Sequence, residues 1–133
     1  MNPRTTSPRA SIDAVRILVV DDEPAVRKLA CAILNRNGYR TITASDGREG
    51  RAVFEQNQNE IRLLVSDLMM PQVDGPTMLR GLRELSPELK SIIITGLGEE
   101  NRISEAKAAG ADVILNKPFT ADQLLAQVKQ LLV

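Results

Sequence analysis

The organisation of this chain is clearest in the stretch RILVVDDEP at residues 16–24. Residues 17–20 are all apolar, which is typical of a strand that is buried on both faces of a parallel sheet. Acidic residues follow this run directly, and Pro24 then occupies a favoured first position of a helix. The next apolar residues recur at helical spacing and predict one buried stripe, namely Val26, Leu29, Ala30, Ile33 and Leu34.

The same alternation of an apolar run and a helical segment recurs along the rest of the chain. The further predicted strands lie at residues 41–44, 63–65, 92–94 and 113–115. Two of the predicted helices begin at the capping pairs Asp46/Glu49 and Thr120/Gln123, and two others end at Gly38 and Gly110. A further helix is predicted from an apolar stripe, namely Met78, Leu79, Leu82 and Leu85. Such alternation predicts an α/β fold, with a doubly wound five-stranded parallel sheet and helices on both faces.

The composition excludes several classes of protein. A chain of 133 residues with 43% hydrophobic and 26% charged residues has the size of one packed domain, which we expect at residues 16–133 after a flexible tail at 1–15. The formal net charge is zero, so no global field favours nucleic acid or an anionic membrane. Histidine is absent, which excludes a Ser-His-Asp triad and an imidazole-bound zinc site. Cys31 is a single cysteine, so no internal disulfide can form.

Chemically active residues follow four of the predicted strands. Asp21 and Asp22 come after the first strand, Asp67 after the third, Thr95 ends the fourth, and Lys117 follows the fifth. Ligands of such sheets bind at the carboxyl ends of the strands, so we expect these side chains to converge. Several carboxylates need a cation to stay ionised together, and an all-oxygen site suits Mg²⁺. The sequence therefore predicts a site that attracts phosphoryl groups, with a carboxylate as the nucleophile.

The motifs at these strand ends resemble those of a known family. They are Asp21-Asp22-Glu23-Pro24, Asp67-Leu68-Met69-Met70-Pro71 with Asp74-Gly75, Thr95-Gly96, and Lys117-Pro118-Phe119. Each motif alone is weak, but together, in this order and spacing, they resemble the receiver domain of two-component response regulators. The resemblance covers about residues 16–133 and implies the flavodoxin-like (βα)5 fold of the CheY-like superfamily.

The resemblance implies a role for each matching residue. Asp67 would accept a phosphoryl group from a phosphohistidine. Asp22 and Asp67 would bind Mg²⁺ together with the backbone carbonyl of Met69, and Asp21 would act through a metal-bound water. Thr95 and Lys117 would each contact a phosphoryl oxygen, helped by backbone N–H groups near Leu68, Met69 and Gly96. The Lys117–Pro118 bond would be a cis peptide.

The implied function is a cytoplasmic signalling switch rather than an enzyme with an external substrate. It would catalyse its own phosphorylation and dephosphorylation. Its donor would be a histidine kinase or a histidine phosphotransfer protein, and its output a downstream effector protein. No direct contact with nucleic acid or membrane is expected, and dimerisation on phosphorylation stays open. The domain would be free-standing or part of a hybrid kinase or longer regulator.

Three positions depart from the family pattern. Ile114 stands where a switching tyrosine or phenylalanine is usual, so we expect output to run through main-chain shifts after Thr95. Gly96 stands where alanine is more usual and frees the backbone there. Met69 and Leu97 flank the site with apolar side chains that cannot orient an attacking water, which predicts slow hydrolysis.

Other functions explain the sequence less well. A phosphatase of the haloacid dehalogenase type would use an Asp-x-Asp nucleophile at the first strand, where this chain has Asp21-Asp22-Glu23. A degenerate receiver that serves only as a docking scaffold would have lost a site residue, and none is missing. A flavin-binding domain would need a phosphate loop rich in glycine and hydroxyl residues after the first strand.

Overall fold

The computed structural model describes residues 15–133, so the tail expected at residues 1–15 lies outside the described part, apart from residue 15. In this part of the chain a single sheet contains β1 (Arg16–Val20), β2 (Arg40–Ala44), β3 (Ile61–Asp67), β4 (Lys90–Thr95) and β5 (Val113–Asn116). All neighbouring strands are parallel, in the order β2-β1-β3-β4-β5. The predicted doubly wound five-stranded sheet is confirmed.

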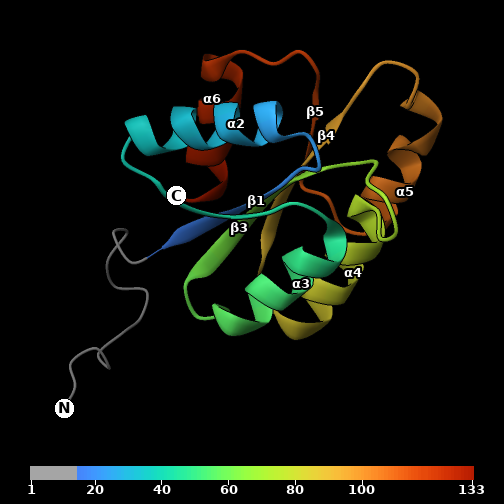
Figure 1. Cartoon of the computed structure of the whole chain (residues 1–133), viewed down its shortest axis with the longest axis horizontal. Coiled ribbons are helices and arrows are strands. Elements are labelled where there is room, and N and C mark those ends of the chain that lie inside the picture. The colour runs from blue at the N-terminus through green and yellow to red at the C-terminus, as the bar shows by residue number, and fades with distance from the viewer. Residues whose placement is uncertain (1–14) are drawn as a thin grey trace.

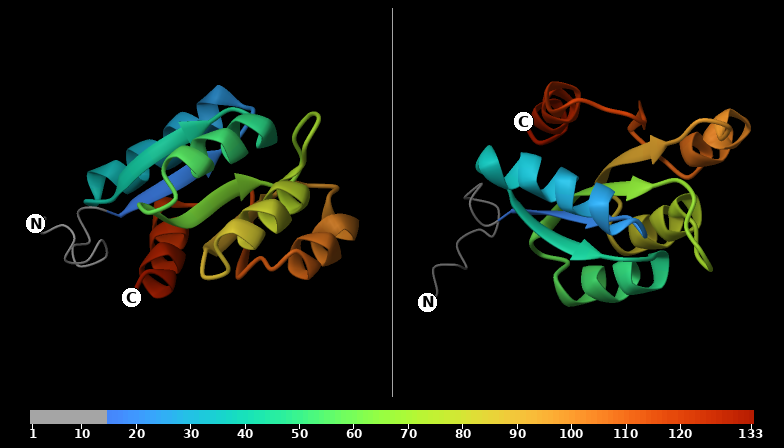
Figure 2. Two further views of the ribbon diagram at one scale, coloured as in Figure 1. Left: turned by 90° about the horizontal axis from the view of Figure 1, so that it is seen from below. Right: turned by 45° about the horizontal axis from the view of Figure 1, so that its top comes forward.

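The helices lie on both faces of this sheet (Figure 1). They are α2 (Pro24–Arg36), α3 (Gly47–Gln56), α4 (Gly75–Leu85), the 3-10 segment η2 (Glu100–Arg102), α5 (Ile103–Ala108) and α6 (Ala121–Leu131). α2 and α6 cover one face, whereas α3, α4 and α5 cover the other, and the two further views in Figure 2 show the same arrangement. None of the helices in residues 15–133 has both the length and the apolar composition that a membrane span requires.

Each strand of the sheet centre supplies both hydrophobic cores because successive side chains of a strand point to opposite faces. In β1, Ile17 and Val19 pack with α2 and α6, whereas Leu18 and Val20 pack with α3 and α4. This two-sided burial explains why residues 17–20 contain no polar side chain.

Local capping interactions set several of the helix starts. Thr120 and Gln123 form the predicted reciprocal capping box of α6. At α3 only one of the two predicted capping contacts is present. The Asp46 side chain accepts from the N–H of Glu49, but the Glu49 side chain accepts from the backbone N–H and the hydroxyl of Ser45. Asp74 caps α4 by accepting from the N–H of Thr77.

The structure corrects two predicted buried positions. On α2, Ala30, Ile33 and Leu34 are buried, but Leu29 is 52% exposed. Leu29 lies one residue before Ala30 and is therefore rotated away from the centre of the buried stripe. Leu85 is also exposed, because it is the last residue of α4. The predicted helix near residues 101–109 is a 3-10 turn followed by a short α-helix.

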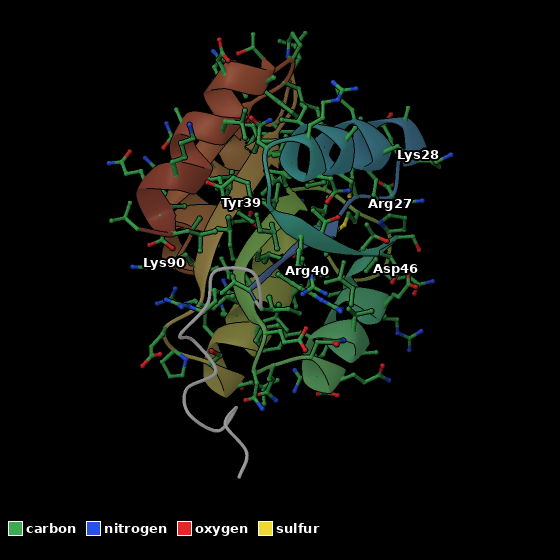
Figure 3. All side chains as sticks on the ribbon, turned by 90° about the vertical axis from the view of Figure 1, so that its left-hand side faces the viewer. Arg27, Lys28, Tyr39, Arg40, Asp46 and Lys90 are labelled. Carbon is green, nitrogen blue, oxygen red and sulfur yellow. The ribbon has the colours of Figure 1, made fainter. Side chains whose placement is uncertain are left out.

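The two ends of the sheet differ in their chemistry. Figure 3 labels Lys90, at the start of β4, on the side opposite Arg27 and Asp46, which lie near the starts of α2 and α3. The acidic motifs lie at the end of the sheet near Arg27 and Asp46. At this end β1 leads into α2 and β2 leads into α3. The fold therefore gathers the candidate site residues at the carboxyl edge of the sheet.

The contrast between Leu82 and Leu85 on α4 tests this account of the core. Leu82 is 0% exposed and Leu85 37% exposed. We expect Leu82→Ala to lower the free energy of unfolding by about 2–5 kcal/mol, because it leaves a cavity under the sheet. The matched Leu85→Ala change should cost less than about 1 kcal/mol. Urea denaturation followed by circular dichroism measures both, and equal losses would contradict the packing described above.

Candidate functional site

The sheet order brings the predicted site residues together. The chain passes from β2 and β1 to β3 on the other side of β1, which makes the β1/β3 boundary the topological switch point. Val20 pairs with Ser66 and Asp67 with Ile94, so these strands end at the same level. Thr95 pairs with Asn116 at the ends of β4 and β5. Asp21, Asp67 and Lys117 therefore lie at the same edge of the sheet, at the ends of β1, β3 and β5.

Three carboxylates meet at this edge. One carboxylate oxygen from each of Asp21, Asp22 and Asp67 lies within 4.8 Å of the others. Asp21 and Asp67 are buried, whereas Asp22 is exposed. Among the described residues, Asp21 Oδ2 and Asp67 Oδ1 are buried oxygens without a hydrogen-bond donor. A buried anionic oxygen without a hydrogen-bond donor is unfavourable unless a cation or a ligand meets it.

Backbone contacts hold Asp21 in place. Its Oδ1 accepts from the N–H of Glu23 at 2.9 Å, and its backbone oxygen accepts from Arg27 Nη1 at 2.6 Å. Its own N–H donates to Ala44 of β2 at 3.3 Å. These contacts leave Oδ2 as the carboxylate oxygen without a hydrogen-bond partner.

Lys117 supplies the positive charge of the site. Its Nζ lies 3.3 Å from Asp67 Oδ1 and 3.3 Å from Glu23 Oε1. The contact to Asp67 is an ion pair without the direction of a good hydrogen bond, since Oδ1 has no such donor. The backbone N–H of Lys117 donates to the Thr95 oxygen at 2.8 Å, and the predicted cis bond to Pro118 is confirmed. Glu23, to which the sequence assigned no role, shares the ammonium group.

The groups that were expected to donate hydrogen bonds to a phosphoryl group donate instead to other atoms of the protein. Thr95 Oγ1 donates to Asn116 Oδ1 at 2.8 Å. The N–H of Gly96 donates to Glu99 Oε1 at 2.7 Å. The N–H of Leu68 donates to the Ile94 oxygen at 2.9 Å, so it extends the sheet and is not free for a ligand. Sequence reasoning missed Glu99 because its role depends on the shape of the turn after β4.

The loop after Asp67 is fixed from two sides. Gly75 packs against the backbone oxygen of Asp67 so closely that a Cβ atom would collide with it. From the other side, Arg102 Nη1 lies 2.9 Å from Met69 Sδ, and its Nη2 lies 2.9 Å from Asp74 Oδ2. Nη2 also pairs with Glu105 of α5 at 2.7 Å. Met69, whose carbonyl is a predicted metal ligand, is therefore held by a residue that the sequence did not single out.

Burial and like charge dominate the electrostatics of the cluster. Burial, followed by the charge of Asp21, raises the pKa of Asp67 to about 7, although Lys117 opposes this rise. Burial also raises the pKa of Asp21. Partial burial disfavours the charge of Lys117, but Asp67, Asp21 and Glu23 outweigh this effect and raise its pKa. One added cation would relieve the repulsion between the carboxylates.

The raised pKa of Asp67 predicts a specific pH dependence of stability. In the unfolded chain Asp67 ionises near 3.8, but in the folded protein near 7. The unfolded state therefore loses this proton first, and stability falls as the pH rises through that window. We expect Asp67→Asn to stabilise the metal-free domain little at pH 4 and by up to about 4 kcal/mol at pH 8.

Urea denaturation in the presence of a chelator measures this difference. The matched control is Asp46→Asn, which keeps a good N-cap for α3 and lies outside the cluster. Its difference from wild type should not follow the same pH window. A gain from Asp67→Asn that is equal at pH 4 and pH 8 would contradict the electrostatic account.

Comparisons with known proteins agree with the fold. The family model of the response regulator receiver domain matches residues 17–129. The sensor kinase CckA of Brucella abortus is 37% identical over 87% of this chain and 12% of that protein. The DNA-binding dual master transcriptional regulator RpaA of Synechocystis is 38% identical over 88% of this chain and 48% of that protein. The chain thus spans half or less of the length of these two relatives.

Solved structures give the same result. A response regulator receiver domain protein from Clostridium thermocellum is similar with a TM-score of 0.83 and 32% identity, over 88% of this chain and 93% of that one. The receiver domain of NtrX from Brucella abortus has a TM-score of 0.81 and 33% identity, over 87% and 97% of the two chains. By its sequence and its fold, this chain belongs to the response regulator receiver domain family, the signalling switches of two-component systems.

Proposed function

We propose that this domain accepts a phosphoryl group from a phosphohistidine onto Asp67 in a Mg²⁺-dependent reaction, and later releases it. The observation that carries the proposal is the environment of Asp67 Oδ1. This buried oxygen lacks a hydrogen-bond donor, lies 3.3 Å from Lys117 Nζ and shares a cluster with Asp21 and Asp22. A carboxylate that is desolvated and faces a single ammonium group is suited to nucleophilic attack on phosphorus.

The carboxylate cluster suits a hard divalent cation. The metal-binding atoms it offers are oxygens, and Asp21 Oδ2 and Asp67 Oδ1 are buried without a hydrogen-bond donor. Asp22, Asp67 and the backbone carbonyl of Met69 would hold Mg²⁺ directly, and Asp21 would hold it through a bound water. When bound, the ion supplies positive charge that stabilises the oxygens of the transferred phosphoryl group.

Residues of this chain carry out the transfer itself and stabilise the phosphoryl oxygens. A carboxylate oxygen of Asp67 forms the new bond to phosphorus while the bond from phosphorus to the donor imidazole breaks, and the imidazole nitrogen keeps the electron pair. Lys117 neutralises one phosphoryl oxygen, and Thr95 donates to another after its hydroxyl has left Asn116. In dephosphorylation water attacks the same phosphorus, the bond from phosphorus to the Asp67 oxygen breaks, and the carboxylate and inorganic phosphate are released.

The partners follow from this chemistry. The donor would be a histidine kinase or a histidine phosphotransfer protein, and the output a downstream effector, both in the cytoplasm. A hydrolase of the haloacid dehalogenase type is disfavoured because the buried nucleophile candidate, Asp67, ends β3 rather than the first strand. A scaffold without chemistry is disfavoured because Asp21, Asp67 and Lys117 form an intact charged cluster.

Phosphorylation of Asp67 can be tested by intact mass after incubation with acetyl phosphate and Mg²⁺. We expect the wild type to gain one phosphoryl group and Asp67→Asn to gain none, because the variant lacks the nucleophile. The matched variant Asp46→Asn should gain one group like the wild type. Phosphorylation of Asp67→Asn at the wild-type rate would contradict the assignment.

The metal requirement is tested in the same experiment. Chelation should abolish the mass gain, and Asp22→Asn should raise the Mg²⁺ concentration that half-maximal phosphorylation needs by about tenfold or more. Asp22 is exposed, so this variant should unfold at nearly the wild-type temperature. Equal phosphorylation with and without a chelator would rule out the metal-dependent mechanism.

The lifetime of the phosphorylated protein is a separate prediction. Met69 and Leu97 lie two residues after Asp67 and Thr95, both are apolar, and Leu97 is 95% exposed. Neither can orient an attacking water, so we expect a half-life of minutes or longer. Leu97→Gln should shorten it severalfold by offering a hydrogen bond to water, whereas Leu97→Ala should not. A wild-type half-life of a few seconds would contradict this prediction.

A further inference from the structure

The turn after β4 is closed by two hydrogen bonds between the same pair of residues. The N–H of Gly96 donates to Glu99 Oε1 at 2.7 Å, and the N–H of Glu99 donates to the Gly96 oxygen at 3.2 Å. Gly98 lies between them with φ +88°, a conformation that favours glycine. The turn therefore holds a carboxylate against the N–H of the residue that follows Thr95.

The charge of this carboxylate acts on the phosphoacceptor. After burial and the charge of Asp21, the charge of Glu99 also contributes to raising the pKa of Asp67. A phosphoryl group on Asp67 would add close to two negative charges and three acceptor oxygens to the same edge. One of these oxygens and Glu99 Oε1 would compete for the Gly96 N–H, and the two anions would repel each other.

We propose that Glu99 is an internal substitute for a phosphoryl oxygen: it occupies the Gly96 N–H while Asp67 is unmodified and leaves it when Asp67 is phosphorylated. This inference rests on the proposed function and adds the residue that regulates it. Because the Glu99 contact must break before the phosphoryl group can bind Gly96, it opposes phosphorylation of the resting protein.

Displacement of Glu99 would also transmit the change to α5. The backbone oxygen of Glu99 accepts from the N–H of Arg102 at 2.9 Å, and η2 begins at the next residue, Glu100. Arg102 in turn pairs with Glu105 of α5. If the Glu99 backbone moves with its side chain, the displacement therefore reaches the residues that precede α5. This route needs no aromatic ring at position 114, where isoleucine packs partly buried against the core.

Binding of beryllium trifluoride with Mg²⁺, a phosphoryl analogue, to the whole chain tests the inference. Isothermal titration calorimetry gives the affinities. We expect Glu99→Ala to bind the analogue about tenfold more tightly than the wild type, the size of a lost hydrogen bond to a charged group. Glu99→Gln should fall between the two, because its amide oxygen still accepts the bond but carries no charge. The neighbouring exposed variant Glu100→Ala should bind like the wild type.

The Gly96 amide resonance in NMR spectra gives a second readout. Adding the analogue should move this resonance in the wild type, and Glu99→Ala should move it before any analogue is added. A merely structural Glu99 would lower the thermal stability of Glu99→Ala and leave the affinity unchanged.

The possible failures are distinguishable. If the wild type binds the analogue and Glu99→Ala binds it no more tightly, Glu99 is not a competitor and only this inference is overturned. If neither the wild type nor any variant binds the analogue, the proposed function is overturned, and this inference with it.

Discussion

The placement of two buried carboxylates beside each other is the constraint on which the rest of this structure depends. Asp21 and Asp67 end neighbouring parallel strands, so the sheet itself forces them together. A single ammonium group, on Lys117, faces Asp67 and is shared with Glu23. The fold thus keeps an excess of negative charge at this edge. The apolar packing on both faces of the sheet provides the stability that the acidic edge lacks. Such an imbalance makes the edge responsive to one added cation or one added anion.

The fold and the core of the site were predictable because both depend on local patterns. Apolar runs and helical stripes set the order of the elements, and parallel strands must present their ends at one edge. The position of Asp21, Asp67 and Lys117 follows from that order alone. The order of the motifs, through the family resemblance, added the expected roles of Thr95 and Met69. Neither residue alone would have indicated such a role.

The parts that were not predictable depend on loop geometry and on the rotation of helices. Leu29 has the right spacing for the buried stripe, but the sheet contacts a narrower strip of α2 centred on other residues. Glu99 and Arg102 look like ordinary surface charges in the sequence, and their partners are set by the turn after β4 and by the approach of the loop around Met69. The Glu49 contact with Ser45 likewise depends on the backbone before α3.

The position of Arg102 also has a thermodynamic consequence. One guanidinium group joins the loop that carries Met69 and Asp74 to Glu105 of α5, so the acidic edge and the α5 surface are connected through a single side chain. Coupling between two sites is reciprocal in free energy. A protein that prefers the α5 surface of the modified domain must therefore favour the modified domain over the unmodified one by the same factor. Such a protein would take part in the equilibrium between the two forms as well as detect it.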